Sequence, residues 1–346
     1  MKLIFFVQML RPDDTIRGFI PGWCRALARA AGGLTVISQE THTAELGEGI
    51  RVLSLGKERG ASKFEQALTL ASILRLELPR HDAMLTHMTP IYSVASSPFA
   101  FLYGRPVFTW YTHSFVGPML RAAIAVSRRV FTASAESLRV DTKKKCVVGH
   151  GIDLAHFLPG PALSSRSGPL RIVSACRLSP VKRVDVLLRA LKGLEGDWTL
   201  EIAGDAPMES QKEHEAEIRR LASALGSRVT LLGAVPYPKM GELLRRSDLY
   251  VNLSGTGSLD KGVLEAVAAG CAVLSGNEAF STFLEGTQER TFLSRVDEAA
   301  VRERLAALIK TSRETLQKDR ELLFEKVKRE HSLDVLAQRL VSEMGG

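Results

Sequence analysis

The segment 170–194, LRIVSACRLSPVKRVDVLLRALKGL, combines the two patterns that decide the fold. Its first six residues, 170–175, are mostly apolar, which is typical of a strand covered on both faces of a sheet. From Lys182 onward, apolar residues recur every three or four positions, which indicates an amphipathic helix. A strand followed directly by a helix is the unit from which parallel sheets are built.

The same alternation of short apolar runs and longer helical segments continues along the whole chain. The strands predicted from it are 2–7, 34–38, 50–55, 83–87, 106–110, 130–132, 145–149, 170–175, 199–203, 228–232, 249–253 and 272–276. The helices predicted most clearly are 16–31, 62–78, 182–194, 210–225, 238–246 and 259–269. Ser62 is expected to cap its helix, because Glu65 follows three residues later and completes a capping box. Parallel strands joined by helices form doubly wound sheets.

A segment rich in Pro, Gly and Ser, residues 158–169, interrupts this alternation and predicts a linker. Because a single core rarely exceeds about 250–300 residues, the 346-residue chain is expected to form two domains. We predict an α/β protein with two Rossmann-like doubly wound domains, residues 1–157 and 170–312, followed by charged helices at 313–346. Two such domains bind ligands where the carboxyl ends of their strands face a shared cleft.

The composition excludes several classes of protein. With 45% apolar and 24% charged residues, the chain has enough apolar surface to fold, which excludes a disordered protein. The longest charge-free stretch, residues 83–104, contains Pro90 and Pro98 and is a poor membrane span. Residues 1–7 are too short an apolar block for a signal peptide and predict a first strand. Four scattered cysteines without a Cys-x-x-Cys pair predict reduced thiols in a cytoplasmic protein.

Positive charge is concentrated in the first half of the chain. Residues 1–160 contain 19 Lys and Arg against 12 Asp and Glu, whereas residues 161–346 contain 27 against 26. A basic surface suits anionic lipid, phosphorylated substrates or nucleic acid, and nucleic acid is disfavoured because no interleaved aromatic and basic pattern accompanies it. The basic residues closest together in sequence are Arg128, Arg129, Arg139, Lys143, Lys144 and Lys145. They form either a solvated face or a peripheral docking site for the inner face of an anionic membrane.

Two basic residues of the second half of the chain occupy positions that suit the binding of an anionic ligand. Arg177 follows the strand 170–175, and Lys182 begins the next helix. Both therefore lie beside the positive end of a helix, an arrangement that suits a diphosphate. The alternative is that both pair with acids such as Asp185 and have a structural role only.

A loop of small residues, 254–261 (SGTGSLDK), follows the strand 249–253. It exposes backbone N–H groups that can hold phosphate or sugar oxygens, or else it is a plain strand-to-helix turn with Ser258 as N-cap. In the helix that follows, Glu265 is surrounded by apolar neighbours. A carboxylate in such a place needs a partner or a function.

At these positions the sequence resembles the retaining, GT-B-fold glycosyltransferases of family 4, the glycosyl transferases group 1. Members have an Asn-Gly-Val-Asp…Phe stretch, a Gly-Arg-Leu…Lys-Gly segment and a Pro-Ser…Glu-x7-Glu-Ala-x-Ala-x-Gly signature. Here these stand as His150-Gly151-Ile152-Asp153…Phe157, Cys176-Arg177-Leu178…Lys182-Arg183 and Leu253-Ser254…Glu265-Ala266-Val267-Ala268-Ala269-Gly270. Shorter similar segments are Thr109–His113, Gly204–Pro207 and Leu232–Val235. The resemblance is strongest over residues 145–276.

The resemblance implies roles for individual residues. Arg177 and Lys182 hold the diphosphate of a nucleotide-sugar donor, Glu265 accepts hydrogen bonds from the nucleotide ribose, and His113 lies against the transferred sugar. It also implies that the C-terminal helices cross back to the N-terminal domain. Trp110 and Tyr111, next to His113, either stack on an acceptor sugar or belong to the core.

The signature departs from the family at one point, because Gly257 stands where the first Glu of Glu-x7-Glu is found. That Glu contacts the donor sugar in the family. The groups expected to replace it are the backbone of Gly257, Ser258, Leu259 and Asp260 and the side chains of Asp260 and Lys261.

The function implied is a retaining hexosyltransferase of glycan biosynthesis, with a glycan, lipid-linked or small-molecule acceptor. No metal is expected, because an Asp-x-Asp motif is absent, and no cofactor is expected, because the nucleotide sugar is itself a substrate. The alternative is a non-catalytic nucleotide-sugar or glycan-binding homologue that lost the first Glu. A nicotinamide-dependent dehydrogenase is disfavoured, because residues 8–12 replace the Gly-x-Gly-x-x-Gly turn.

Overall fold

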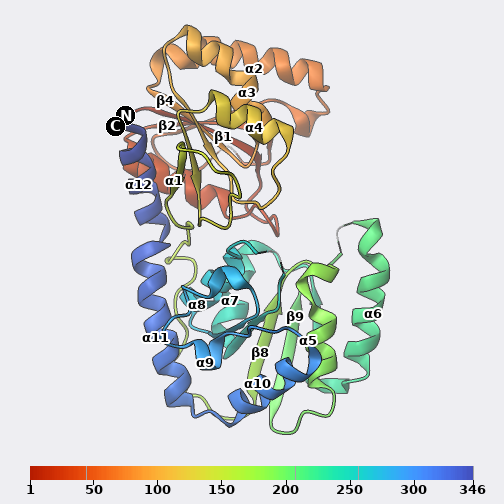
Figure 1. Cartoon of the computed structure of the whole chain (residues 1–346). Helices are drawn as coiled ribbons and strands as arrows, with labels where there is room; N and C mark the ends of the chain where they lie inside the picture. The colour runs from red at the N-terminus through yellow and green to blue at the C-terminus, as the bar shows by residue number, and fades with distance from the viewer. Residues whose placement is uncertain (44, 207, 256, 346) are drawn as a thin grey trace. The chain divides into compact units, whose positions relative to one another are not determined.

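The computed structural model of the protein (Figure 1) describes residues 1–43, 45–206, 208–255 and 257–345. The chain folds into two compact units. Residues 1–153 and 330–346 form the first unit, and residues 154–329 form the second. Each unit contains one parallel sheet with helices packed on its faces. The predicted α/β class with two Rossmann-like domains is therefore confirmed.

The sheet of the first unit has the strand order β3-β2-β1-β4-β5-β6-β7, with every pair parallel. Its strands are β1 (Leu3–Leu10), β2 (Leu34–Thr41), β3 (Ile50–Ser54), β4 (Ala83–His87), β5 (Val107–Trp110), β6 (Arg129–Thr132) and β7 (Lys145–Val147). The central strand β1 pairs Leu3 with Leu34 on one side and with Ala83 on the other. Each of these strands was predicted from its apolar run.

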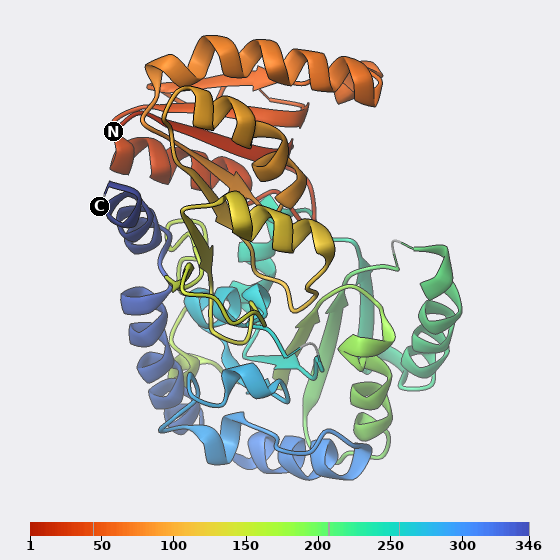
Figure 2. The ribbon, with the colours of Figure 1, turned by 45° about the horizontal axis from the view of Figure 1, so that its top comes forward.

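The alternation of side chains along β1 separates two helical layers. The helices of this unit are α1 (Ile20–Ala31), α2 (Lys63–Glu77), α3 (Pro90–Leu102), α4 (Pro118–Val126) and α12 (Leu333–Gly345). Leu3, Phe5 and Val7 pack in one core with α1 and α12. Ile4 and Phe6 point to the other face and pack with α2 and α3 (Figures 1 and 2). The predicted capping box of Ser62 and Glu65 begins α2.

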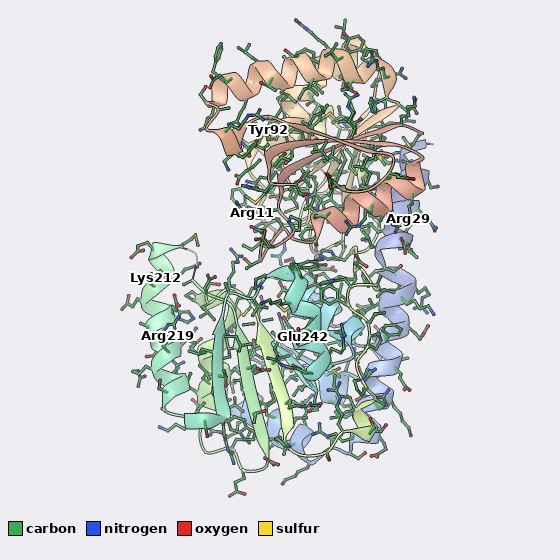
Figure 3. All side chains as sticks on the ribbon, turned by 180° about the vertical axis from the view of Figure 1, so that it is seen from behind. Arg11, Arg29, Tyr92, Lys212, Arg219 and Glu242 are labelled. Atoms are coloured by element: carbon green, nitrogen blue, oxygen red, sulfur yellow. The ribbon has the colours of Figure 1, made fainter. Side chains whose placement is uncertain are left out.

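The sheet of the second unit has five parallel strands in the order β10-β9-β8-β11-β12. These strands are β8 (Leu170–Ala175), β9 (Trp198–Ala203), β10 (Val229–Gly233), β11 (Leu249–Asn252) and β12 (Ala272–Ser275). The helices around it are α5 (Val184–Leu191), α6 (Lys212–Ser223), α7 (Tyr237–Arg246), α8 (Lys261–Ala269), α9 (Gln288–Thr291), α10 (Glu298–Lys310) and α11 (Arg313–Glu330). Figure 3 shows α6 with its labelled basic residues Lys212 and Arg219.

The Pro-, Gly- and Ser-rich segment 158–169 is packed into the second unit. Leu163 is fully buried in that unit's core, and its N–H donates to Gln317 Oε1 at 2.7 Å. Arg166 donates to Asp248 Oδ1 at 2.8 Å. The segment predicted as a linker is thus anchored on both sides by side chains of the second unit.

The last two helices belong to different units. Helix α11 lies in the second unit, whereas α12 packs on α1 of the first, with Leu336 and Leu340 in the shared core. Arg29 of α1 donates to Asp334 of α12 at 2.7 Å, and Figure 3 labels Arg29 beside this helix. The chain returns to the first unit at residue 330, so only the end of the predicted segment 313–346 lies there.

Helix α3 occupies most of the charge-free stretch 83–104. Pro90 is tolerated because it stands in the first turn, where its missing N–H has no intrahelical acceptor, and Pro98 lies inside the helix. Across the described residues, no helix has both the length and the apolar composition needed to cross a bilayer.

Candidate functional site

Two loops of the second unit lie side by side at the carboxyl edge of its sheet. They are residues 176–183 after β8 and 253–260 after β11, and β8 and β11 are neighbours in the sheet. The chain leaves β8 toward β9 on one side and leaves β11 toward β12 on the other, so the strand order reverses between them. Ligands of open α/β sheets bind in the crevice at such a point.

Lys182 connects the two loops. Its Nζ donates to Asp260 Oδ1 at 2.9 Å and to Ser254 Oγ at 3.2 Å. Asp260 also accepts from Asn252 Nδ2 at 3.0 Å, so both of its carboxylate oxygens are engaged. The alternative partner named from the sequence, Asp185, forms its ion pair with Arg189 of its own helix at 2.7 Å. The acid that holds Lys182 comes instead from the facing loop.

Arg177 is exposed at the start of the loop after β8, and none of the described residues forms an ion pair with it. Its loop is fixed by the neighbouring loop after β9, because Leu178 N donates to Asp205 O at 2.8 Å. A Cβ on Gly204 would lie 1.8 Å from the Cys176 carbonyl oxygen, so this close approach requires a glycine. Pro207, the last residue of the predicted glycine-bearing loop, lies outside the described residues.

Arg183 has a left-handed backbone conformation, with φ 54° and ψ 35°, immediately before α5. This region costs a residue with a Cβ about 1–2 kcal/mol. The resembled family has Gly after its Lys at this position, and Gly adopts the conformation without strain. The predicted helix start at Lys182 is two residues too early, because Pro180–Lys182 form a short 3-10 turn and α5 starts at Val184.

The loop before α8 is held from both sides. Gly255 N donates to Val181 O at 3.0 Å, and Asn277 Nδ2 donates to Ser258 O at 2.8 Å. Gly257 has φ 60°, a left-handed conformation that suits glycine. Thr256, which belongs to the quoted loop, lies outside the described residues.

Ser258 does not cap α8, contrary to one of the two interpretations of the loop. The helix begins at Lys261, so Asp260 occupies the N-cap position. Its side chain makes no capping hydrogen bond and binds Lys182 and Asn252 instead. The first backbone N–H groups of α8 are consequently not capped by that carboxylate, and this end of the helix suits an anion.

Glu265 is 8% exposed on α8, and its partner is Lys261, one helical turn earlier. Lys261 Nζ lies 2.7 Å from Glu265 Oε1. The same ammonium lies 5.0 Å from the centre of the Tyr237 ring, which stacks on His156. The buried carboxylate thus has the partner that the sequence required, and the ion pair is flanked by aromatic rings.

Two acidic groups near these loops remain protonated. Burial raises the pKa of the Cys176 thiol to about 11, so it is not a thiolate nucleophile at neutral pH. Burial also raises the pKa of Tyr250, whose hydroxyl donates to Ala175 O at 2.8 Å. A Cβ on Gly262 would lie 2.6 Å from that hydroxyl oxygen, so glycine keeps the start of α8 close to β8.

His113 lies in the first unit, in an exposed position on the loop after β5. Its Nδ1 accepts from Phe115 N at 3.0 Å. A neutral imidazole with an accepting Nδ1 carries its proton on Nε2, which is then the donor available to a ligand.

Aromatic rings gather at the carboxyl ends of β4 and β5. Trp23 packs edge-on against His87 at 5.0 Å and against Trp110 at 4.9 Å between ring centres. Trp110 is 1% exposed, so it belongs to the core and does not stack on an acceptor. Tyr111 is also buried, and its hydroxyl donates to Phe115 O at 2.9 Å.

Met88, which follows β4, was missed by sequence analysis. It has φ 56°, and Met88 and Arg183 are the non-glycine residues with positive φ among those that the structure describes. Its sulfur accepts from Thr112 N at 3.2 Å and so joins the loops after β4 and β5. Methionine is not typical of turns, so no local sequence pattern predicts the positive φ of Met88.

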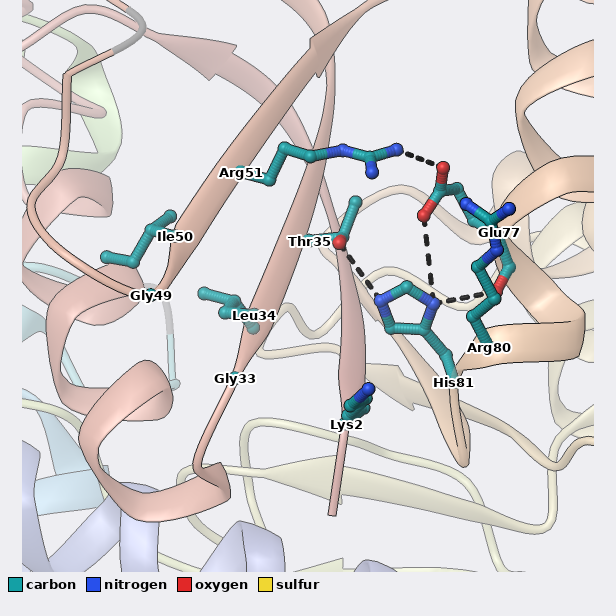
Figure 4. Close-up of a pocket in the computed structure, with 10 residues that line it drawn as sticks. All are labelled: Lys2, Gly33, Leu34, Thr35, Gly49, Ile50, Arg51, Glu77, Arg80 and His81. Carbon is teal, nitrogen blue, oxygen red and sulfur yellow. Dashed lines mark hydrogen bonds and ion pairs between the residues drawn. The ribbon is translucent and has the colours of Figure 1, made fainter.

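A pocket of about 410 Å³ lies at the opposite, amino edge of the first sheet (Figure 4). Inside it, Glu77 pairs with Arg51, and its carbonyl accepts from His81 Nδ1 at 2.6 Å. His81 Nε2 lies 2.9 Å from Thr35 Oγ1, so both ring nitrogens are engaged. Arg51, Glu77, His81 and Thr35 thus bind one another, and the pocket lies at the edge of the sheet away from the carboxyl ends of the strands, so we assign it a structural role.

In the described part of the chain, no three His, Cys, Asp or Glu side chains gather as metal ligands. In the two loops and the start of α8, residues 176–183 and 253–265, the charged residues are Arg177, Lys182, Arg183, Asp260, Lys261 and Glu265. Cations exceed carboxylates in this set, which favours an anionic ligand.

Comparison with known families identifies the second unit. Residues 169–311 match the family model described as glycosyl transferases group 1. The match covers less than half of the chain and lies within the second unit. It contains both loops joined by Lys182, and the resemblance seen in the sequence is thereby confirmed for this domain. No curated protein matches the sequence significantly.

Solved structures show the same fold over the whole chain. HepE from Anabaena, solved with UDP and glucose, is 15% identical with a TM-score of 0.77, and the match covers 100% of each chain. A glycosyltransferase from Rickettsia africae is 15% identical with a TM-score of 0.75, covering 99% of this chain and 97% of that one. Sucrose-phosphate synthase from Thermosynechococcus elongatus is 13% identical with a TM-score of 0.71, covering 99% and 98%. The two-domain GT-B architecture is therefore confirmed.

Proposed function

We propose that the protein transfers a sugar from a nucleotide-sugar donor to an acceptor hydroxyl with retention of the anomeric configuration. The observation that carries this proposal is the Lys182 bridge at the switch point of the second sheet, within the stretch that matches the glycosyl transferases group 1 model. A fixed cation at this place meets the part of the donor that carries most charge, the diphosphate.

The second unit supplies the electrostatic part of the reaction. When the bond between sugar and diphosphate breaks, negative charge accumulates on the leaving nucleoside diphosphate. Lys182, Arg177 and the N–H groups at the start of α8 stabilise that charge. Ser254 and Asp260 engage two of the three Lys182 ammonium hydrogens, so the third remains for a phosphate oxygen. The ammonium is already in place before the donor binds, and little reorganisation is needed in the transition state.

The donor sugar is assigned to the loop that replaces the family's first Glu. We assign the contacts with the sugar to backbone groups of residues 257–260 and to the side chains of Asp260 and Lys261. Asp260 keeps acceptor capacity beyond its bonds to Lys182 and Asn252, because each carboxylate oxygen has two lone pairs. It therefore replaces the missing carboxylate as the acceptor for sugar hydroxyls.

Glu265 is assigned to the ribose. Lys261 neutralises the carboxylate and holds Oε1, which leaves Oε2 to accept from the ribose hydroxyls. His113 is assigned to the transferred sugar, toward which its Nε2–H donates, because Nδ1 is occupied by Phe115 N. The acceptor is a glycan, a lipid-linked sugar or a small molecule.

Catalysis is proposed to be independent of metal, because Lys182 and Arg177 provide positive charge where other glycosyltransferases use a divalent cation. Activity after dialysis against EDTA is expected to equal that of the untreated protein. An absolute requirement for magnesium or manganese contradicts this part of the proposal.

Gly257 favours a second candidate function, a nucleotide-sugar-binding homologue without catalysis. Gly257 has no side chain where the family has a carboxylate, so sugar contacts are fewer in this chain. The two candidates agree on donor binding and differ only in turnover.

A thermal-shift panel of nucleoside diphosphates and nucleotide sugars tests the proposal first. UDP-glucose is the first compound to include, because HepE from Anabaena was solved with UDP-glucose. A ligand at a hundred times its dissociation constant stabilises the folded state by about 2.7 kcal/mol. A shift followed by release of nucleoside diphosphate with an acceptor supports the enzyme, and an NMR spectrum of the product determines the anomeric outcome. A shift without turnover supports the binding homologue, and no shift with any nucleotide contradicts both.

A further inference from the structure

Apolar side chains are exposed together on one helical layer of the first unit. The described residues include fifteen exposed large apolar side chains, and nine of them fall within residues 64–126. These nine are Phe64, Leu68, Leu76, Ile91, Phe101, Leu102, Phe115, Met119 and Val126. They lie on or between α2, α3 and α4, which form one layer on the sheet (Figures 1 and 2). Such clustering marks an interaction surface, because single exposed apolar residues are normally scattered.

Helix α3 is apolar on both of its sides. On the inner side Tyr92, labelled in Figure 3, stacks on Phe6 of β1 with 3.9 Å between ring centres. On the outer side the exposed residues follow one another at helical spacing from Ile91 through Pro98 to Phe101 and Leu102. Ser93 and Ser96 are buried polar exceptions on the inner side, and an apolar outer side is normally covered by another element. Phe101 is nevertheless 90% exposed and Leu102 72% exposed.

The charge around α3 and α4 has one sign. Residues 83–135 contain four Arg and no Asp or Glu. A groove of about 510 Å³ between the C-terminal ends of α3 and α4 is lined by Arg105, Arg128 and Lys144 together with Phe101 and Val126. No acidic side chain lines it among the described residues. An apolar rim around a cationic groove is complementary to an anionic lipid headgroup with its acyl chains.

The hydrogen bonding of Arg105 indicates that this groove binds an anion. Its Nε is buried and has no hydrogen-bond acceptor in the described residues. A buried cationic donor without an acceptor is costly, and a phosphate oxygen removes that cost. Lys144 differs, because its Nζ donates to Ile124 O at 2.9 Å and to Ala125 O at 2.7 Å and so caps α4.

The basic cluster seen in the sequence is therefore not the docking face as a whole. Arg129 pairs with Glu343, and Lys145 Nζ lies 3.5 Å from Leu138 O. Lys144 is engaged as a helix cap. Of that cluster, Arg128 and Lys144 line the groove, and the apolar residues and Arg105 were not part of the sequence expectation.

We propose that the α3–α4 face, defined as Phe101, Leu102, Arg105, Val126 and Arg128, docks on the surface of an anionic bilayer. Phe101 and Leu102 enter the boundary between headgroups and acyl chains, and the two arginines bind lipid phosphates. The face is independent of the donor site proposed above, since it lies wholly in the first unit. Its acid-free charge and protruding apolar residues favour a bilayer over a protein partner, whose surface carries both signs of charge.

Co-sedimentation of the full chain with vesicles tests this docking. The vesicles contain phosphatidylcholine alone or with increasing phosphatidylglycerol, at low and at high salt. Binding is expected to increase with the anionic fraction and to decrease with salt. The variant Phe101→Ser/Leu102→Ser is expected to bind at least about tenfold more weakly. The variant Arg105→Gln/Arg128→Gln is expected to bind about 25-fold more weakly, since each basic residue near the surface contributes about fivefold.

Matched controls come from α11 of the second unit. Lys318→Gln/Lys328→Gln removes the same charge, and Leu322→Ser removes a side chain that is 45% exposed. Both control variants are expected to bind like the parent protein. Because the Arg105 guanidinium is partly buried, Arg128→Gln alone replaces the arginine variant if the double variant does not fold, and it is expected to bind about fivefold more weakly.

A fluorescent probe tests insertion directly. Trp23, Trp110 and Trp198 are buried, so a tryptophan placed at position 101 is the residue that responds to lipid. Phe101→Trp is expected to shift its emission to the blue on anionic vesicles and to be quenched by brominated acyl chains, whereas Leu322→Trp is not.

Several results overturn the proposal. They are absence of binding at low salt, equal binding to neutral vesicles, unchanged binding of both face variants, and an unshifted Phe101→Trp spectrum. A further contradicting result is that Phe101→Ser/Leu102→Ser dissociates a dimer of the protein without affecting vesicle binding, because the face then covers a second copy of the chain.

Discussion

In the second unit, the loops at the carboxyl ends of β8 and β11 are built from charged side chains, with Lys182 held between them. In the first unit, the loops after β4 and β5 are built around aromatic rings and a methionine. A charged ligand can be bound by only a few residue types, so the second unit, to which we assign the nucleotide-sugar donor, contains recognisable sequence motifs. Many combinations of residues allow aromatic rings to pack, so the first unit contains few recognisable sequence motifs.

Both loop sets contain one non-glycine residue in the left-handed conformation, Arg183 in the second unit and Met88 in the first. Each follows a strand that flanks the point where the strand order reverses. Strain of this kind persists where surrounding structure holds it and is concentrated at functional sites. Each sheet thus has such a residue next to its switch point, but on opposite sides of it, because Arg183 follows the first strand of its unit and Met88 follows the strand beyond the reversal.

The largest difference between the two units is expected in kcat/KM, when the activity of a variant lacking one lysine of the second unit is compared with that of a variant lacking one lysine of the first. Lys182→Ala removes a cation that stabilises the leaving diphosphate, and kcat/KM for the donor is expected to fall about 100-fold. Lys144→Ala removes a helix cap from the first unit and is expected to lower stability by about 1 kcal/mol with kcat/KM unchanged. Steady-state kinetics and thermal melts of both variants check this. Full activity of a folded Lys182→Ala protein excludes Lys182 from diphosphate binding.

The units also differ in their response to acid. Burial lowers the pKa of His331 in the first unit from its usual 6.5 to about 4. Between these pH values the unfolded chain binds a proton that the folded unit excludes. The first unit is therefore expected to lose up to about 3 kcal/mol as the pH falls from 6.5 to 4. In the second unit, burial raises the pKa of Asp248, but hydrogen bonds from Arg171 and Arg166 outweigh it and lower that pKa. The stability this carboxylate adds is lost only below its ordinary pKa.

Tryptophan fluorescence separates these two effects. In a Trp198→Phe background, Trp23 and Trp110 report on the first unit alone. Urea unfolding of this variant at a series of pH values should show the loss between 6.5 and 4. His331→Asn keeps an acceptor for His150 N, which His331 Nδ1 binds at 3.0 Å, and does not titrate. An identical pH dependence with and without His331 contradicts the assignment.

The fold could be predicted because each buried strand is a short apolar run between helices, a pattern that is local in sequence. The positions of Arg177, Lys182 and Glu265 followed from the same pattern, since ends of strands and starts of helices can be located. The partner of Lys182 could not, because Asp260 is distant in sequence while Asp185 is near. Side-chain pairs between residues distant in sequence depend on the order of the strands in the sheet, and the apolar sequence pattern does not reveal that order.

The same reason explains what was missed in the first unit. The return of α12 to that unit was implied by the family resemblance, but no local pattern predicts it, because it depends on packing between Leu336 and α1, far apart in the chain. The conformation of Met88 depends on contacts with Thr112 of a neighbouring loop. The exposure of Phe101 was not predictable either, because an apolar residue in a helix is normally assigned to a core.

A moderate effect is expected at Glu265. Glu265→Gln keeps the shape of the side chain but weakens it as an acceptor, so affinity for a ribonucleotide should fall about tenfold. Affinity for the 2′,3′-dideoxy analogue should stay the same. Isothermal titration with both nucleotides measures the difference. Lys261→Met is the control, because it also removes the ion pair but leaves the carboxylate. Equal losses for both nucleotides in Glu265→Gln would remove the ribose from this assignment.

The smallest effect concerns the two left-handed residues and compares the units most directly. Arg183→Gly relieves the strain of a Cβ at φ 54° and is expected to stabilise the second unit by about 0.5–1 kcal/mol, after the larger entropy of the unfolded glycine is subtracted. Arg183→Ala is the control, since it loses the guanidinium but keeps the Cβ, and it should not stabilise the second unit.

Met88→Gly should destabilise the first unit, because the Met88 side chain packs into its core and its sulfur binds Thr112 N. Denaturant midpoints of the three variants measure these changes. If Arg183→Gly and Arg183→Ala shift the midpoint equally, backbone strain is absent, and the likeness between the two switch points reduces to their strand order.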